Sequence, residues 1–534
     1  MTTQTAPSSL PDRFNFAQHL FARNRARGAK TAYIDDNGHL SYAELADRAQ
    51  RFASVLMGLG VRREERVLLL MHDCNDWPVA FLGSLYAGVV PVAVNTLLTA
   101  DDYAYMLEHS RAQVALVSSA LLPTLQAAIA KASHEVQAVV VSSPAAPVGG
   151  GASASGTPTL DFDHCVASAT PMATAVPTGR DDIGFWLYSS GSTGRPKGTA
   201  HTHGNLYWTA ELYAAPVLGL SEQDVCFSAA KLFFAYGLGN GLSFPLSVGA
   251  TVVLMAERST PDACFRRFTE LRPTVFFGAP TGYAGMLASP KLPSRTEVAL
   301  RLCSSAGEAL PREIGERWTA HFGCEIIDGI GSTEMLHIFL SNRPGDVRYG
   351  TTGKAVPGYV VELRDDTGHV LTGSDEVGDL YISGPSSALM YWGNREKSNE
   401  TFRGAWTKSG DKYFRDADGY YVYAGRSDDM LKVSGQYVSP FEVESTLMQH
   451  PAVLESAVIG VDDANGLTRA KAFVLLKDKS LGSEALAHEL QAFVKAKLAP
   501  YKYPRQIEFL PELPKTATGK IQRFKLRELE KSRA

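Results

Sequence analysis

The alternation of hydrophobic and polar positions predicts helices and strands in turn along the first third of the chain. Residues 41–60 carry apolar side chains at helical spacing, and Ser41 and Glu44 stand at the spacing of a capping box at its start. Apolar runs at 67–71 and 89–94 predict buried strands, and a helix-like segment separates them. Repeated strand–helix–strand units are typical of parallel sheets covered by helices. We therefore expect an α/β fold.

Residues 77–100 carry no charge over a length that would suffice for a membrane span. Two prolines, two glycines and an asparagine interrupt the stretch, which favours a buried helix followed by a buried strand. The N-terminus has no basic segment followed by an apolar stretch, so no secretory signal is expected. We predict a cytoplasmic protein without a membrane partner.

The pattern changes in the second half of the chain. From about residue 350, short strands and turns such as those in 360–371 predict a small antiparallel, barrel-like subdomain that ends near 425. Mixed helical and extended segments follow, which predicts a small α+β domain over 426–534 after a large N-terminal domain over 1–425. Residues 144–179 are rich in Ala, Pro, Ser, Gly and Thr and are expected to form an exposed connection.

Composition excludes several classes of function. The 534 residues are 45% hydrophobic with a net charge of −4, so the chain can bury large cores and has no basic bias toward nucleic acid. Its six cysteines include no C-x-x-C pair, which argues against a disulfide framework or a zinc site.

Residues 188–198, YSSGSTGRPKG, combine glycines, hydroxyl side chains and one lysine. Glycine lets the backbone approach an anion, and successive N–H groups and hydroxyls can surround phosphates. The stretch is not a P-loop, because Pro196 occupies the position of its second glycine. The glycine clusters at 237–241 and 329–334 lack dinucleotide-binding spacing. A solvated linker is the alternative, but apolar residues 183–188 favour a buried strand that leads into a phosphate loop.

This loop resembles that of the adenylate-forming superfamily, which includes acyl- and aryl-CoA ligases, peptide-synthetase adenylation domains and luciferases. Further motifs of the superfamily follow in order: DGIGSTE (328–334), SGD (409–411), GRSDDMLKVSGQYVSPFEVE (425–444) and PKTATGK (514–520). The stretches AKLFFAYGLGNGLSFP and GSTEMLHIFLSNRPGD resemble the benzoate-CoA ligase branch. The resemblance implies two α/β subdomains in the large domain and a mobile C-terminal domain that turns about a hinge at Asp428.

The resemblance also implies a reaction: benzoate, ATP and CoA give benzoyl-CoA, AMP and pyrophosphate through benzoyl-AMP, with Mg²⁺ as cofactor. Two anions meet in the first step, so catalysis should consist mainly of positioning and charge neutralisation. The expected partners are these small molecules, in the breakdown of aromatic compounds, and related enzymes are commonly homodimers.

Each motif assigns residues to a role by resemblance. Lys520 matches the lysine that bridges the carboxylate and the α-phosphate, Glu334 the magnesium ligand and Thr333 a phosphate contact; Lys432 and Gly435 match the path of CoA. Asp411 and Arg426 match the ribose contacts, although either would also suit an ordinary ion pair. Ile330 departs from the family, because many members carry an adenine-stacking tyrosine there. The remaining expected ATP and AMP contacts are Ser189, Ser190, Gly191, Ser192, Thr193, Gly194, Lys197, Ala306, Gly307, Glu308, Asp328, Gly329, Gly331 and Ser332.

The expected acyl-binding residues are mostly aromatic or small, which suits a flat, short ring better than a long alkyl chain. No charged residue stands among them to pair with an amino group, which disfavours amino-acid substrates. His337 is expected either to donate a hydrogen bond or to fill space. These residues are Phe234, Ala235, Tyr236, Ala306, Gly331, His337 and Ile338.

Three other functions stay open at this point. Within the class, the alternative is a 4-hydroxybenzoate or medium-chain acyl-CoA ligase. An adenylating enzyme that loads a carrier protein uses the same first step, and an inactive adenylate-binding scaffold would share the fold. The presence of Glu334, Asp411 and Lys520 together argues against the scaffold.

Overall fold

The structure, a computed structural model, describes residues 10–143, 151–152, 156–189, 195–427, 429–433, 436–462, 468–498, 502–515 and 521–533. The chain divides into two compact units, a larger one of residues 1–360 and 382–407 and a smaller one of residues 361–381 and 408–534. The predicted boundary at 425/426 falls inside the smaller unit, so it remains a prediction about the family's domains.

The larger unit contains two nine-stranded sheets. The first has the order β20-β10-β9-β4-β3-β5-β6-β8-β7, and its strands are β3 (Arg66–Leu70), β4 (Val90–Ala93), β5 (Ala112–Ser118), β6 (Ala138–Ser142), β7 (Gly151–Ala152), β8 (Pro158–Asp161), β9 (Ile183–Ser189), β10 (Lys197–Thr202) and β20 (Met390–Tyr391). Pairing is parallel from β9 through β4, β3, β5 and β6 to β8, and antiparallel where β10 joins β9 and β20 joins β10.

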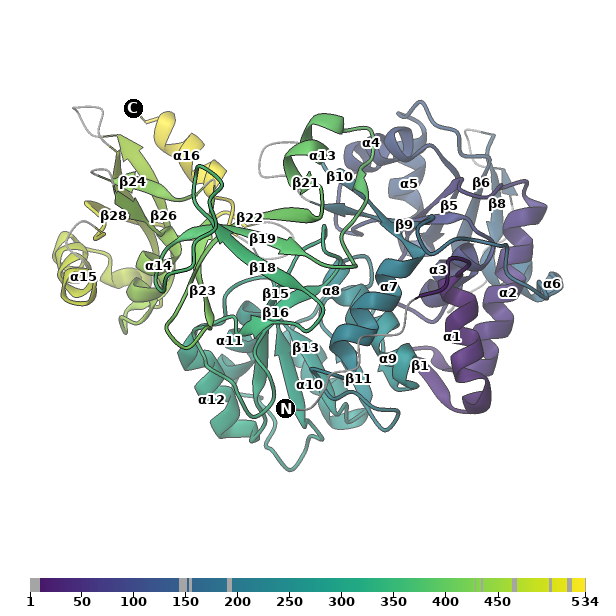
Figure 1. Cartoon of the computed structure of the whole chain (residues 1–534), viewed down its shortest axis with the longest axis horizontal. Helices are drawn as coiled ribbons and strands as arrows, with labels where there is room; N and C mark the ends of the chain where they lie inside the picture. The colour runs from purple at the N-terminus through teal and green to yellow at the C-terminus, as the bar shows by residue number, and fades with distance from the viewer. Residues whose placement is uncertain are drawn as a thin grey trace. The chain divides into compact units, whose positions relative to one another are not determined.

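Helices cover both faces of this sheet (Figure 1). Because successive strand residues point to opposite faces, Val67 and Leu69 pack in one core and Leu68 and Leu70 in another. The helices of the first core include α1 (Phe16–Asn24), α2 (Tyr42–Gly58), α3 (Asp76–Tyr86) and α6 (Phe162–Ser168), and those of the second include α4 (Ala100–Ser110) and α5 (Leu122–Ile129). The predicted parallel α/β arrangement is confirmed.

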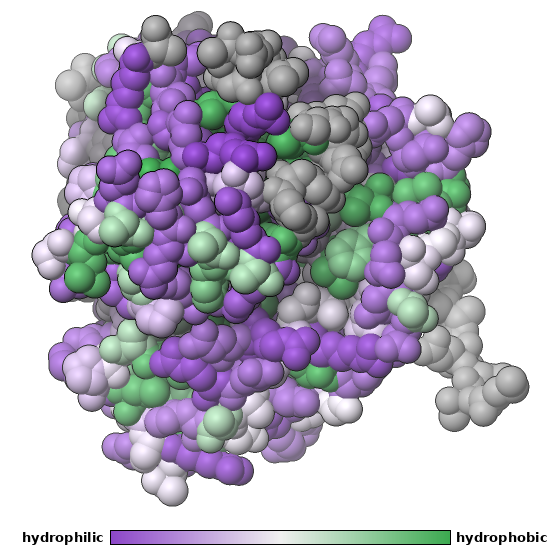
Figure 2. All heavy atoms as spheres, turned by 90° about the vertical axis from the view of Figure 1, so that its left-hand side faces the viewer, coloured by the Kyte–Doolittle hydropathy of each residue, from purple (hydrophilic) through white to green (hydrophobic). Residues whose placement is uncertain are grey.

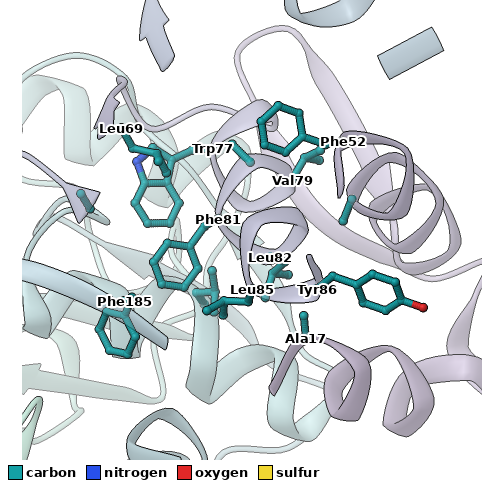
Figure 3. Close-up of a cluster of buried hydrophobic side chains, with 14 of the residues drawn as sticks. Ala17, Phe52, Leu69, Trp77, Val79, Phe81, Leu82, Leu85, Tyr86 and Phe185 are labelled. Atoms are coloured by element: carbon teal, nitrogen blue, oxygen red, sulfur yellow. The ribbon is translucent and has the colours of Figure 1, made fainter. Parts of the chain in front are cut away.

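The uncharged stretch 77–100 forms a buried helix and then a buried strand, as predicted. Every residue of α3 is buried. Trp77 stacks on Phe81 with ring centroids 5.1 Å apart, and Phe81 meets the edge of Phe185 on β9, as Figure 3 shows. No helix within the described ranges is long and apolar enough to cross a membrane.

The second sheet has the order β17-β16-β15-β14-β13-β11-β12-β1-β2. Its strands are β1 (Thr31–Asp35), β2 (Gly38–Ser41), β11 (Val225–Ser228), β12 (Thr251–Val253), β13 (Val275–Gly278), β14 (Leu302–Ser305), β15 (Ile326–Gly331), β16 (Ile338–Ser341) and β17 (Lys354–Ala355). The central pairs are parallel and both ends are antiparallel. The other helices of this unit are α7 (His203–Thr209), α8 (Ala235–Leu238), α9 (Phe244–Val248), α10 (Pro261–Glu270), α11 (Pro280–Ala288), α12 (Arg312–Phe322) and α13 (Arg395–Thr401).

The prediction of an exposed connection over residues 144–179 is wrong for part of its length. Residues 158–161 form β8, which pairs in parallel with β6, and helix α6 follows directly. Phe162 and Val166 are buried, and Asp161 accepts a hydrogen bond from the backbone N–H of His164 at the start of the helix. A few apolar positions and one helix cap therefore outweigh the surrounding small residues.

The smaller unit is mixed α+β, as predicted. The strands β18 (Val360–Arg364), β19 (Gly378–Ser383), β22 (Trp406–Arg415) and β23 (Tyr421–Arg426) belong wholly or partly to this unit, because the unit boundaries fall inside β18, β19 and β22. They form a five-stranded sheet whose fifth strand, β21 (Phe402–Arg403), is assigned to the larger unit. The remaining elements are β24 (Leu431–Val433), β25 (Gln436–Val438), β26 (Val453–Asp462), β27 (Thr468–Leu476), β28 (Gln506–Phe509), α14 (Pro440–Met448), α15 (Glu484–Lys497) and α16 (Arg523–Lys531).

Figure 2 shows one view of the surface, coloured by the hydropathy of each residue. Hydrophilic residues dominate this face, and hydrophobic residues appear on it in small, separate groups. Scattered groups of this kind are normal on a protein surface.

Candidate active site

The ends of the glycine-rich loop are held by two paired strands. β9 ends at Ser189 and β10 begins at Lys197, and these two residues are antiparallel partners. Ser189 is buried, and its Oγ has no hydrogen-bond partner in the part of the chain that the structure describes. A buried hydroxyl without a partner calls for an explanation, and a ligand in the loop would supply one. The predicted contacts Ser190, Gly191, Ser192, Thr193 and Gly194 lie outside the described residues and stay predictions.

Two predicted groups of opposite charge meet at a tyrosine that the sequence analysis did not single out. The Tyr391 hydroxyl donates to Glu334 Oε1 at 2.6 Å. Lys197 Nζ lies 3.3 Å from the Tyr391 oxygen and 4.3 Å from the centroid of its ring. The structure thus brings Lys197 and Glu334 to one place, although they are far apart in sequence.

A buried histidine holds the backbone before Glu334. His201 Nε2 lies 2.8 Å from the Thr333 carbonyl oxygen, and Asn205 Nδ2 lies 2.9 Å from His201 Nδ1. Burial lowers the pKa of His201 to about 4, so the ring is neutral near pH 7. Because a carbonyl only accepts, the single ring proton belongs on Nε2, and Nδ1 accepts from the asparagine. His201 was also missed by the sequence analysis.

The expected adenine contacts lie at the carboxyl ends of neighbouring parallel strands. Ser305 on β14 pairs with Asp328 on β15, and Ala306 and Gly307 follow β14 directly. Gly307 has φ +95°, a conformation that favours glycine. Ligands of open α/β sheets commonly bind at this edge. Glu308 accepts a hydrogen bond from Thr281 Oγ1 at 2.9 Å.

Asp328 is buried, and burial raises the pKa of its carboxyl well above the usual value. Its Oδ1 has no hydrogen-bond partner among the described residues. A buried oxygen without a hydrogen-bond donor fits the predicted contact with the amino group of a base. Its neighbours Gly329, Ile330 and Gly331 complete β15 and pair with β16.

The expected acyl-binding residues pack around an imidazole. His337 Nε2 lies 3.3 Å from the Tyr236 carbonyl oxygen, and the ring centroids of His337 and Phe244 are 4.3 Å apart. The Tyr236 hydroxyl donates to Ser304 Oγ at 3.1 Å. Burial lowers the pKa of His337 to about 3, so this group of side chains carries no charge at neutral pH. His337 thus makes a hydrogen bond inside a packed cluster, and its role toward the acid stays a prediction.

Two glycines make this packing possible. A Cβ on Gly239 would lie 2.6 Å from His337 Nε2, and a Cβ on Gly331 would lie 2.5 Å from the His337 carbonyl oxygen. Real Cβ atoms do not approach this closely, so only glycine lets these two backbones come so near His337, one to its ring and the other to its main chain. Of the other predicted pocket residues, Phe234 precedes α8, Ala235 begins it, Ile338 pairs with Gly331, and Ala306 follows β14.

The two predicted ribose contacts lie together in the smaller unit. Asp411 on β22 and Arg426 on β23 are cross-strand partners, and Arg426 Nη1 donates to Asp411 Oδ1 at 3.1 Å. Gly410 has φ +77°, and a Cβ there would lie 2.9 Å from Arg426 Nη2. The arrangement would let Asp411 and Arg426 contact one ligand together. Their role in binding ribose stays a prediction. Asp428, Gly435 and Lys520 lie outside the described residues, as does the side chain of Lys432.

The residues around Glu334 fit a Mg²⁺ ion that would take most of its ligands from substrate phosphates and water. Within the described ranges, no group of three or more His, Cys, Asp or Glu side chains is placed to hold a metal ion. Mg²⁺ commonly uses one or two carboxylates together with phosphate oxygens and water. Glu334 supplies one carboxylate, whose Oε1 already accepts from Tyr391.

The fold and these residues define an AMP-binding enzyme. The family model described as "AMP-binding enzyme" matches residues 20–392, and the model of the "AMP-binding enzyme C-terminal domain" matches residues 442–520. The chain belongs to this family, as its motifs indicated.

Individual members are similar over nearly the whole chain. The benzoate–CoA ligase of Thauera aromatica is 56% identical over 529 residues, which cover 98% of each chain. The 4-hydroxybenzoate–CoA/benzoate–CoA ligase of Rhodopseudomonas palustris is 46% identical over 97% of this chain and 94% of that one. The crystal structure of a benzoate CoA ligase from Burkholderia xenovorans LB400 has 63% sequence identity and a TM-score of 0.88, over 96% of this chain and 100% of the other.

Proposed function

We propose that the protein is an ATP-dependent benzoate-CoA ligase that forms benzoyl-CoA, AMP and pyrophosphate through benzoyl-AMP. Relatives that carry this activity in their names match 98% and 96% of this chain, at 56% and 63% identity. The observation that carries the choice of acid is the uncharged cluster of Tyr236, Phe244 and His337. Rings packed against an unprotonated imidazole suit a flat aromatic acid.

In the first half-reaction, a benzoate oxygen attacks the α-phosphorus of ATP, the new O–P bond forms, and pyrophosphate leaves with the electrons of the broken bond. The reactants are both anions, so fixed positive charge and exact placement lower the barrier. Lys520 bridges the carboxylate and the α-phosphate, and Lys197 and the 190–194 segment bind the other phosphates. When Mg²⁺ is bound, it neutralises phosphate charge, and Glu334 holds it while Thr333 contacts a phosphate.

The remaining nucleotide contacts divide between base and ribose. Asp328 accepts from the adenine amino group, and Ile330 gives apolar contact where other members stack a tyrosine. Asp411 and Arg426 bind the ribose hydroxyls, for which paired carboxylate oxygens are suitable acceptors.

In the second half-reaction, the CoA sulfur attacks the acyl carbon, and the C–O bond to AMP breaks, so AMP keeps the oxygen that came from benzoate. We propose that the C-terminal domain turns about Asp428 between the two steps, which removes Lys520 and introduces Lys432 and Gly435. A hinge needs only a few positions that absorb the backbone change. A cytoplasmic location and a homodimeric state are further predictions of this proposal.

The test of the proposed function is pyrophosphate release with benzoate, 4-hydroxybenzoate and octanoate, each with and without CoA. We expect benzoate to give the highest kcat/KM and to yield benzoyl-CoA when CoA is present. Apolar shape alone should discriminate against small substituted benzoates by only about 10²-fold or less. Preference for 4-hydroxybenzoate or octanoate would reassign the substrate, and no release with any acid would favour an adenylate-binding scaffold.

A further inference from the structure

Tyr391 contacts both of the charged groups that the larger unit contributes to the proposed phosphate site. We propose that Tyr391 is a positioning residue: it fixes one oxygen of the Glu334 carboxylate and the Lys197 ammonium, and thereby sets the affinity of the enzyme for metal–ATP. The inference rests on the proposed function, since it requires Glu334 to bind the metal.

The geometry lets one phenol serve two opposite charges. The Tyr391 side chain is buried, and its hydroxyl has a single proton, which the 2.6 Å bond to Glu334 Oε1 uses. Its oxygen therefore faces Lys197 Nζ, at 3.3 Å, as an acceptor. The ammonium also lies 4.3 Å from the ring centroid, where the aromatic face attracts a cation. Hydrogen bonds to charged groups are stronger than neutral ones, so both contacts should hold well.

The place of Tyr391 is set by the same strand that begins at Lys197. Tyr391 on β20 pairs with Thr199 on β10. The backbone N–H of Leu389 donates to the Ala200 carbonyl at 2.9 Å, and that of Trp392 donates to the Gly198 carbonyl at 2.7 Å. The strand ladder therefore fixes the distance between the tyrosine and the end of the glycine-rich loop.

The segment that carries Tyr391 also holds the backbone around Glu334. The N–H of Ala388 donates to the Glu334 carbonyl at 2.7 Å, and Ser386 Oγ donates to the Met335 carbonyl at 2.8 Å. Together with the Tyr391 hydroxyl, these contacts restrain both the main chain and the side chain of Glu334. A group restrained in this way loses little freedom when it binds an ion.

The consequence concerns how the carboxylate meets the metal. Because Oε1 accepts from Tyr391, we infer that the hydroxyl holds the Glu334 carboxylate in the orientation in which it would meet the metal. Removal of an outer partner that orients a metal ligand typically weakens metal binding about 10- to 100-fold. Loss of the hydroxyl alone, with the ring retained, should lie near the lower end of this range.

The test compares Tyr391→Phe with Tyr42→Phe. Tyr42 is also buried and donates to a backbone carbonyl, that of Ala250, at 2.6 Å. Binding of Mn²⁺–ATP is measured without benzoate by electron paramagnetic resonance of free Mn²⁺. The Mg²⁺ concentration for half-maximal ATP–pyrophosphate exchange is measured separately. We expect Tyr391→Phe to weaken the binding of Mn²⁺–ATP about tenfold and to raise the half-maximal Mg²⁺ concentration about tenfold. Its KM for benzoate should be unchanged. Tyr42→Phe should leave all of these quantities as in the wild type.

Wild-type metal–ATP binding in Tyr391→Phe would overturn the proposal. So would a loss of binding that simply follows unfolding at the assay temperature, because Tyr391 would then be structural. Glu334→Gln separates this inference from the proposed function: if that variant binds metal–ATP normally, the role of Glu334 itself is wrong. If it binds weakly, adding Tyr391→Phe should weaken it little further, since the two side chains act as one unit.

Discussion

Lys520→Ala is expected to lower the rate of benzoyl-AMP formation by about 10²–10³, the usual effect of removing one preorganised charge from a developing anion. The lysine is proposed to neutralise the carboxylate and the α-phosphate as they meet, and alanine leaves their repulsion in place. The second half-reaction is proposed to use a different part of the C-terminal domain. Conversion of supplied benzoyl-AMP and CoA to benzoyl-CoA should therefore proceed at nearly the wild-type rate.

The control for Lys520→Ala lies in the same PKTATGK motif. Lys515 Nζ donates a hydrogen bond to Glu455 Oε1 at 2.7 Å within the smaller unit, and Lys515 has no proposed part in the reaction. Lys515→Ala should leave both half-reactions unchanged, when each is followed by ATP–pyrophosphate exchange and by thioester formation from synthetic benzoyl-AMP. Equal losses in the two half-reactions of Lys520→Ala would contradict the proposed alternation of the C-terminal domain.

Glu334→Gln is expected to reduce ATP–pyrophosphate exchange by about 10²-fold, a loss in the range found when a group that stabilises the charge of the transition state is removed. The substitution keeps an oxygen that can accept from the Tyr391 hydroxyl but removes the negative charge that Mg²⁺ requires. Local packing should therefore survive while metal binding fails. Raising the Mg²⁺ concentration should restore part of the activity.

The measurement is a titration of exchange activity with Mg²⁺ at fixed ATP, beside a thermal unfolding curve. Glu325→Gln is the matched control, because Glu325 directly precedes β15, the strand that leads to Glu334, and its Oε2 accepts from the backbone N–H of Gly345 at 2.9 Å. It should titrate like the wild type. A Glu334→Gln enzyme with normal activity and normal Mg²⁺ dependence would remove Glu334 from the proposed site.

Much of the fold followed from local pattern. The capping box at Ser41 and Glu44 is present at the start of α2. The uncharged stretch forms α3 and β4, with Gly88 at φ +67° between them. Strand β8 and helix α6 were missed because their few apolar residues stand among alanines, serines and prolines. Only the pairing of β8 with β6 makes those residues part of the core.

The site was predictable as far as its motifs reach. Glu334, Lys197, Asp411 and Arg426 were named from the sequence, and the structure places each pair together within its own unit. Tyr391 was missed because its contacts depend on the pairing of β20 with β10, and no spacing within the motifs encodes that ladder. The roles proposed for Lys520, Asp428 and residues 190–194 still rest on motif resemblance.

The most direct test of the proposed reaction follows the oxygen atoms of the acid. The enzyme is incubated with ATP, CoA and benzoate whose carboxylate carries ¹⁸O, and the AMP released is analysed by mass spectrometry. If the carboxylate attacks the α-phosphorus, each AMP carries one ¹⁸O in its phosphate. AMP that contains no label, formed together with benzoyl-CoA, would contradict the account.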